Sequence, residues 1–163
     1  MKRLRSRSGF TLIELVGSIV ILGLLALIGT LGIINVIDGY RFAANNAELS
    51  QKAETALMRM TIELSYLVTN GILSGTATSI NYRSDFGSGN EDHTLSLSGS
   101  QIQLDTITLT DLVDGGGFQL LYYASDGVTQ VSPASAKIIG ISLTLRGANN
   151  LIRVFITRVA LRS

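Results

Sequence analysis

An apolar segment near the start of the chain constrains its fold more than any other feature. It runs from Phe10 to Ile37, and because Glu14 is its one charged residue, the last 23 residues carry no charge. As a helix, 23 residues are long enough to cross a hydrocarbon core of about 30 Å. Four cations precede the segment: Lys2, Arg3, Arg5 and Arg7. The sequence therefore predicts one transmembrane helix over residues 10–37, with a cytoplasmic N-terminus and the rest of the chain outside.

The small residue Gly9 lies before the apolar segment, whereas an ordinary secretory signal places its small residues after a shorter apolar region. The run MKRLRSRSGFTLIELV resembles the class III signal of type IV pilins and of type II secretion pseudopilins. The resemblance implies that residues 1–9 are a leader peptide, which prepilin peptidase removes between Gly9 and Phe10. It also implies N-methylation of Phe10 and assembly of the membrane helix into the core of a filament.

Glu14 is the fifth residue after this cleavage site. A carboxylate near the end of a membrane helix costs about 2–3 kcal/mol to insert unless it finds a partner or reaches the interface. In one interpretation, the Glu14 side chain extends to water and its negative charge interacts favourably with the positive N-terminus of the helix. In the other, which the resemblance implies, it pairs with the Phe10 amine of a neighbouring subunit and directs assembly.

Beyond the membrane segment, residues 38–70 are expected to continue the helix in amphipathic form, to about Val68. No proline precedes Pro133, and Thr69-Asn70-Gly71 is expected to end the helix. Charged residues, among them Glu63 and the i,i+4 pair Glu48–Lys52, fill the polar faces. Apolar residues recur at spacings of three and four, which is typical of core packing: Leu49, Ala53, Ala56, Leu57, Met60, Leu64 and Leu67.

Four glycines lie in the membrane half of the helix: Gly17, Gly23, Gly29 and Gly32. Each glycine costs roughly 1 kcal/mol of helix propensity relative to alanine. Many pilins have a proline here, where the helix loosens in the filament, and this chain has none. The glycines either supply that loosening, leave the helix straight, or allow close packing between helices.

Residues 71–163 have the composition of strands and turns. Alternation of apolar and polar residues predicts a hairpin of Thr94–Ser98 with Gln101–Leu109. The sequence Asp114–Gly117 is expected to interrupt the regular secondary structure. Further strands are predicted over Phe118–Ala124, Lys137–Leu145 and Leu151–Leu161. The fold class is α+β, with an antiparallel sheet against the long helix, as the pilin resemblance also implies.

Composition narrows the range of possible functions further. The chain has no cysteine, so it lacks the C-terminal disulfide of many major pilins, and this favours a minor pilin or minor pseudopilin. Without residues 1–9, nine Lys and Arg face twelve Asp and Glu, a net charge of −3. Direct binding of nucleic acid is not expected from that balance.

No grouping of residues indicates catalysis, so the chain is predicted not to be an enzyme and to need no cofactor. The one histidine, His93, follows the loop Ser84–Asp92 and is expected to be solvated, since metal sites need several converging ligands. The acidic loops Asp85–Asp92 and Asp111–Gly117 offer oxygen ligands for calcium but lack the spacing of a known motif. No metal site is therefore predicted.

These observations predict a structural subunit of a pilus-like or pseudopilus filament in the bacterial inner membrane and periplasm, of a minor or initiating kind. Its expected partners are prepilin peptidase, other pilin subunits, the inner-membrane assembly platform and lipid. Secretion, twitching, adhesion and DNA uptake all use this type of N-terminus. The alternatives are an uncleaved membrane-anchored binding module and a membrane-tethered enzyme.

Overall fold

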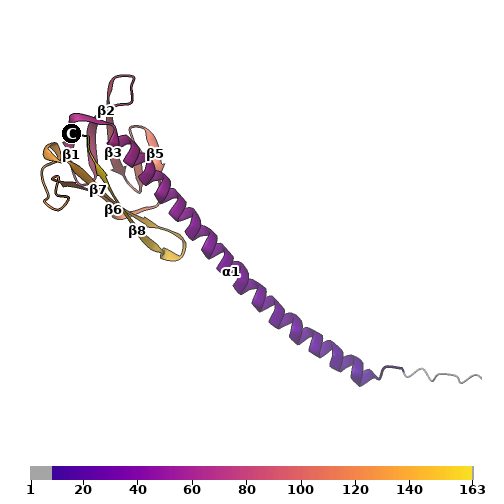
Figure 1. Cartoon of the computed structure of the whole chain (residues 1–163). Helices are drawn as coiled ribbons and strands as arrows, with labels where there is room; N and C mark the ends of the chain where they lie inside the picture. Colours follow the sequence, from indigo (N-terminus) through magenta and orange to yellow (C-terminus); the bar gives the residue numbers. More distant parts are fainter. Residues whose placement is uncertain (1–8, 163) are drawn as a thin grey trace, which may run out of the picture. The chain divides into compact units, whose positions relative to one another are not determined.

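The computed structural model describes residues 9–162 and confirms the α+β class, with one long helix and two antiparallel sheets. The helix α1 extends over Leu12–Ser65 without a break (Figure 1). The chain divides into two compact units, with described residues up to Ala43 in the first and those from Ala44 onward in the second. Helix α1 contributes to both.

The first unit consists of the apolar part of α1. It is the one helix of the described residues long and apolar enough to cross a membrane, as judged by length and composition. The helix is continuous through all four glycines of the predicted membrane segment, and a Cβ atom at any of them would meet nothing within 4 Å. Packing within this chain therefore does not require glycine at these positions.

The second unit contains two sheets where the sequence suggested one. The five-stranded sheet follows chain order: β1 (Leu67–Gly75), β2 (Ser79–Asp85), β3 (Asn90–Ser98), β4 (Gln101–Leu104) and β5 (Ile107–Thr110). The three-stranded sheet has the order β6 (Val113–Tyr123), β7 (Ile138–Arg146) and β8 (Ile152–Ala160). Two short 3₁₀ turns complete the unit, η1 (Pro133–Ser135) and η2 (Ala148–Asn150).

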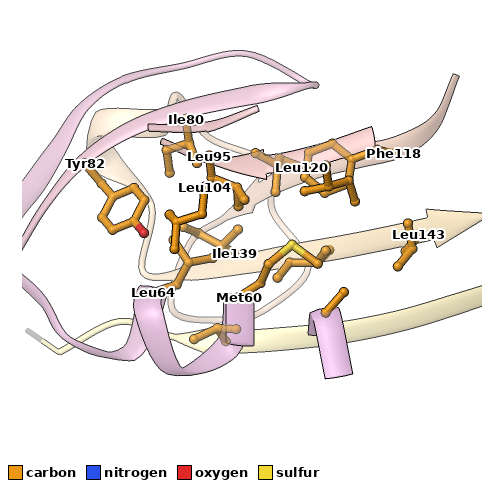
Figure 2. Close-up of a cluster of buried hydrophobic side chains, with 14 of the residues drawn as sticks. Met60, Leu64, Ile80, Tyr82, Leu95, Leu104, Phe118, Leu120, Ile139 and Leu143 are labelled. Atoms are coloured by element: carbon orange, nitrogen blue, oxygen red, sulfur yellow. The ribbon is translucent and has the colours of Figure 1, made fainter. Parts of the chain in front are cut away.

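The predicted apolar stripe of the helix is confirmed as part of the core. All of its residues are buried except Leu57, which is partly buried against the others. Figure 2 shows Met60 and Leu64 of α1 pointing toward side chains of both sheets, among them Leu95 and Ile139. Because full burial of a side chain of this size stabilises a fold by about 1.5–3 kcal/mol, this stripe accounts for the attachment of the helix to the sheets.

The end of the helix differs from the prediction. Helix α1 ends at Ser65, and β1 begins at Leu67 and runs through the Thr69-Asn70-Gly71 sequence that was expected to terminate the helix. Asn70 has a φ of 57°, and the register of β1 against β2 shifts here. A Cβ atom on Gly71 would lie 2.6 Å from the carbonyl oxygen of Arg83. The Asn-Gly pair therefore forms an irregularity within a strand, because Asn70 tolerates a left-handed backbone and Gly71 has no Cβ atom to obstruct the neighbouring strand.

Two strand predictions also need correction. The segment Gln101–Leu109 is not one strand but β4 and β5, joined by a turn in which Asp105 has a φ of 54°. The sequence Asp114–Gly117 is not a break but lies inside β6, where the register against β7 shifts between Val113 and Phe118. The strands predicted over Lys137–Leu145 and Leu151–Leu161 are confirmed to within one residue at each end, whereas the strand predicted over Phe118–Ala124 begins five residues earlier, at Val113, and ends at Tyr123.

Candidate functional site

The residues around the predicted cleavage site lie at the start of α1. Gly9 and Phe10 precede the helix and belong to no regular element, and both are exposed. A Cβ atom on Gly9 would meet nothing within 4 Å. The peptide bond between these residues is therefore accessible in the described chain. The leader cations Lys2, Arg3, Arg5 and Arg7 lie outside the described residues.

Glu14 takes part in a capping box with Thr11. The backbone N–H of Glu14 donates to Thr11 Oγ1 at 3.4 Å, and Glu14 Oε2 accepts from the backbone N–H of Thr11 at 3.3 Å. Thr11 Oγ1 also donates to the same carboxylate oxygen at 3.2 Å. Two N–H groups that the first turn of a helix leaves without partners are thus satisfied reciprocally. The carboxylate also lies at the positive end of the helix.

Sequence reasoning missed this role, although the signal was present. A Thr followed three residues later by Glu, immediately before an apolar run, is the sequence pattern of a capping box. The structure thus favours one of the two interpretations of Glu14 for the isolated chain, the one in which it stabilises the N-terminus of its own helix. The pairing of Glu14 with a neighbour's amine stays a prediction.

The helix that follows presents an almost uninterrupted apolar surface. The described large apolar side chains between Leu12 and Ile37 are exposed in the single chain, Leu12 and Ile13 to 81% each. Its two hydroxyl groups are satisfied inside the helix, since Ser18 donates to Glu14 O and Thr30 donates to Ala26 O, both at 2.8 Å. Such a segment is suited to lipid or to the apolar faces of other helices, except at the exposed side-chain amide of Asn35.

The predicted loop around His93 is smaller than expected, and His93 is not a solvated loop residue. It lies in β3, and its Nδ1 is 2.8 Å from Asp105 Oδ2. Asp105 Oδ1 also accepts from the Thr94 backbone N–H at 2.7 Å. The histidine therefore helps to hold the turn between β4 and β5 against β3.

The acidic loops considered for calcium use their carboxylates within the fold. Asp85 accepts hydrogen bonds from the backbone N–H groups of Gly87 and Gly89. Asp111 pairs with Lys52 at 3.0 Å, and Asp114 pairs with Arg146 at 2.7 Å. Within residues 9–162, no group of three or more metal-ligating side chains comes together.

Glu63 lies elsewhere than the sequence suggested. Its side chain is 3% exposed, whereas it was expected on a solvated face of the helix. It pairs with Arg59 at 2.6 Å and accepts from the hydroxyl of Tyr82 at 3.4 Å. Burial, followed by the charge of Glu63, raises the pKa of Tyr82 well above its ordinary value, so the hydroxyl remains a donor. A buried carboxylate is tolerated here because two partners compensate it.

Comparison with known families identifies one motif. Residues 4–30, which include Gly9, Phe10 and Glu14, match the family model described as the prokaryotic N-terminal methylation motif. This motif is the signal of type IV pilins and pseudopilins, so the chain carries the signal of a prepilin peptidase substrate. The comparisons with curated proteins and with solved structures find no significant match.

Proposed function

We propose that the chain is a subunit of a type IV pilus-like or type II secretion pseudopilus filament, cut between Gly9 and Phe10, methylated at Phe10 and assembled from the inner membrane. The observation that carries the proposal is the match of residues 4–30 to the methylation motif. The apolar helix that follows the motif supports it, since this helix is suited to a single-pass anchor.

The start of the helix is compatible with such processing. The proposed cut lies before Thr11, and the capping box uses only atoms of Thr11 and Glu14. Removal of residues 1–9 therefore leaves every group of the cap in place. The mature chain would begin with a free, methylated amine at Phe10, one helical turn from Glu14.

Assembly in this proposal is driven by apolar packing between α1 helices, with Glu14 and the processed amine of a neighbour setting their register. The exposed apolar side chains of residues 12–37 supply the surface, and the glycines leave room for close approach. The assembly platform of the inner membrane would extract the subunit, whose second unit faces the periplasm. A minor or initiating position is favoured because the chain has no cysteine and so lacks the disulfide-closed loop of many major pilins.

The experiment that tests the proposal is the mass and N-terminal sequence of the membrane-extracted protein, made with and without an active prepilin peptidase. A chain that begins at N-methylated Phe10 only when the peptidase is present is the expected result. Gly9→Val should abolish the cut, because a branched side chain obstructs close approach to the scissile bond. Gly39→Val is the matched control, since Gly39 is equally open but lies within the helix.

An intact leader under both conditions would overturn the proposal. The chain would then be an uncleaved membrane-anchored binding module of the periplasm, and the motif at residues 4–30 would have no processing role.

A further inference from the structure

Strand β8 is an edge strand with one side free. Within residues 9–162 it pairs only with β7, in continuous register over all nine residues from Ile152 to Ala160. At the two ends of the pair, Leu161 N–H donates to Lys137 O, and Leu151 O accepts from Gly147 N–H. Backbone groups alternate in direction along an antiparallel strand, so the odd-numbered residues of β8 face β7. The N–H and C=O groups of residues 152, 154, 156, 158 and 160 therefore point to the free side.

The usual protection of an edge strand is weak here. Proteins protect such edges with bulges, prolines, short strands or many charges. Strand β8 has no register shift and no proline, and five of its nine residues are β-branched. Three apolar side chains on one face of the strand are exposed: Ile152 to 48%, Val154 to 59% and Ile156 to 72%.

An apolar groove of about 510 Å³ lies between this strand and the last turns of α1. The helix contributes Leu57, Met58, Thr61 and Ile62, and the strand contributes Ile156 and Thr157. Consecutive residues of a strand point to opposite faces, so a groove lined by both Ile156 and Thr157 follows the edge of β8 itself. A segment in this groove would meet the free backbone groups and the apolar side chains together.

The charge around the edge is mainly positive. From Gly127 to the last residue, the chain contains five cations and no Asp or Glu. Of these, Arg146 pairs with Asp114, whereas Arg153 and Arg158 form no ion pair with any residue between 9 and 162. Arg153 donates instead to Ser50 Oγ, and Arg158 to Gly127 O. Glu54 is the one carboxylate on the lining of the groove, on its helix side.

We propose that the free edge of β8 and the adjoining groove bind an extended acidic segment of a partner protein as an additional strand. Backbone hydrogen bonds to β8 would hold the segment, and its apolar side chains would fill the groove. Arg153 and Arg158 lie on opposite faces of β8, so the carboxylates of the segment would face the arginine on their own side of the sheet. A second copy of β8 suits the site less well, since it would add arginines and no carboxylate to the shared sheet. The proposal rests on residues of the second unit and does not depend on processing at Gly9.

The test uses the full chain in detergent micelles and fluorescein-labelled peptides, with binding followed by anisotropy. The probes are an eight-residue peptide of alternating Glu and Val, the same peptide with Lys for Glu, and an acidic peptide N-methylated along one backbone edge. The acidic peptide should bind at least about tenfold more tightly than the other two. Equal binding of the lysine or N-methylated peptide, or no binding of the acidic peptide up to about 1 mM, would overturn the proposal.

Variants locate the site. Ile156→Pro removes one outward N–H without removing a hydrogen bond to β7, so it should weaken binding while the circular dichroism spectrum stays unchanged. Arg153→Glu combined with Arg158→Glu should weaken binding of the acidic peptide, and Glu54→Gln should leave or strengthen it. Val128→Ser, at an apolar residue exposed outside the groove, is the control and should have no effect. Wild-type self-association that Ile156→Pro abolishes would show that a second copy is the occupant, against the proposal.

Discussion

At the scale of single residues, the carboxylate of Glu14 has two roles, one in its own helix and one in the proposed filament. In the isolated chain it accepts from the Thr11 backbone N–H and so caps its own helix. In the proposed filament it also faces the amine of a neighbour. A carboxylate has two oxygens and about four lone-pair sites, so both uses are compatible. They differ in that the cap requires only an acceptor, whereas the pairing requires a negative charge.

Two substitutions separate these uses. Glu14→Gln keeps a side-chain acceptor that serves a capping box, whereas Glu14→Leu removes both acceptor and charge. We expect both variants to insert into the membrane and to be cut, and both to be incorporated poorly into filaments, because neither has the charge. The measurement is the amount of each variant in sheared filaments relative to membranes. Normal incorporation of the glutamine variant alone would show that the cap, not the ion pair, is what assembly requires.

Glu63 is a second residue whose surroundings decide its role. Arg59→Met removes the half-exposed cation that pairs with the buried carboxylate of Glu63 and leaves that carboxylate with the Tyr82 hydroxyl alone. We expect a loss of about 1–3 kcal/mol in the free energy of unfolding, the cost of an undercompensated buried polar group. Urea unfolding of the full chain in micelles, followed by the near-ultraviolet circular dichroism of tyrosine, measures it.

The control for this prediction is Lys52→Met, which removes a cation from pairs with Glu48 and Asp111 that water reaches. It should change the unfolding curve little, because solvent screens such pairs. A double variant, Arg59→Met with Glu63→Leu, should recover stability relative to Arg59→Met. If it is instead less stable, the buried carboxylate stabilises the fold through Tyr82 even without Arg59.

At the scale of elements, the irregularities of β1 and β6 replace breaks that the sequence suggested. Gly117 lies where β6 shifts register, and a Cβ atom there would be 2.6 Å from the Thr144 carbonyl oxygen. Gly115, two residues earlier, has open space around it. The two glycines look alike in sequence but differ in what surrounds them.

Gly117→Ala is therefore expected to cost about 1–3 kcal/mol of stability, since the added methyl group must displace the backbone of β7. Gly115→Ala should change the free energy of unfolding by no more than about 0.5 kcal/mol. Thermal or urea unfolding of the two variants side by side provides the comparison. Equal effects would mean that Gly117 does not lie in a closely packed irregularity of β6.

At the scale of the whole molecule, the two units differ in the environment that their apolar side chains require. The core of the second unit draws on residues from Leu49 to Val159 and on none before Ala44. The described residues of the first unit form no core of their own, and their apolar side chains are exposed. Its stability therefore depends on lipid or on other helices, whereas the second unit buries its apolar residues internally.

A chain that begins at Ala44 is accordingly expected to fold in buffer without detergent, with the far-ultraviolet circular dichroism of a mixed helix and sheet protein. The full chain should require detergent for extraction. Size-exclusion chromatography with circular dichroism tests the fragment, and fractionation of membranes tests the full chain. An unfolded or aggregated fragment would show that the second unit needs residues 10–43 for its stability.

The sequence by itself determined the features that depend on local order. The N-terminal methylation motif, the long helix and its core stripe follow from residue types at fixed spacings along one helix, and the final strand pair follows from alternation. The capping box of Thr11 and Glu14 belongs to this class too, because its partners are three residues apart.

Only the tertiary structure decided the features that depend on partners distant in sequence. Burial of Glu63 beside Tyr82, the pairing of His93 with Asp105 and the free edge of β8 each involve residues brought together by the sheets. The same holds for Asn70-Gly71 and Gly115–Gly117, which are turn residues by local preference. Cross-strand hydrogen bonds and packing outweigh that preference, so these residues lie inside strands as irregularities of register.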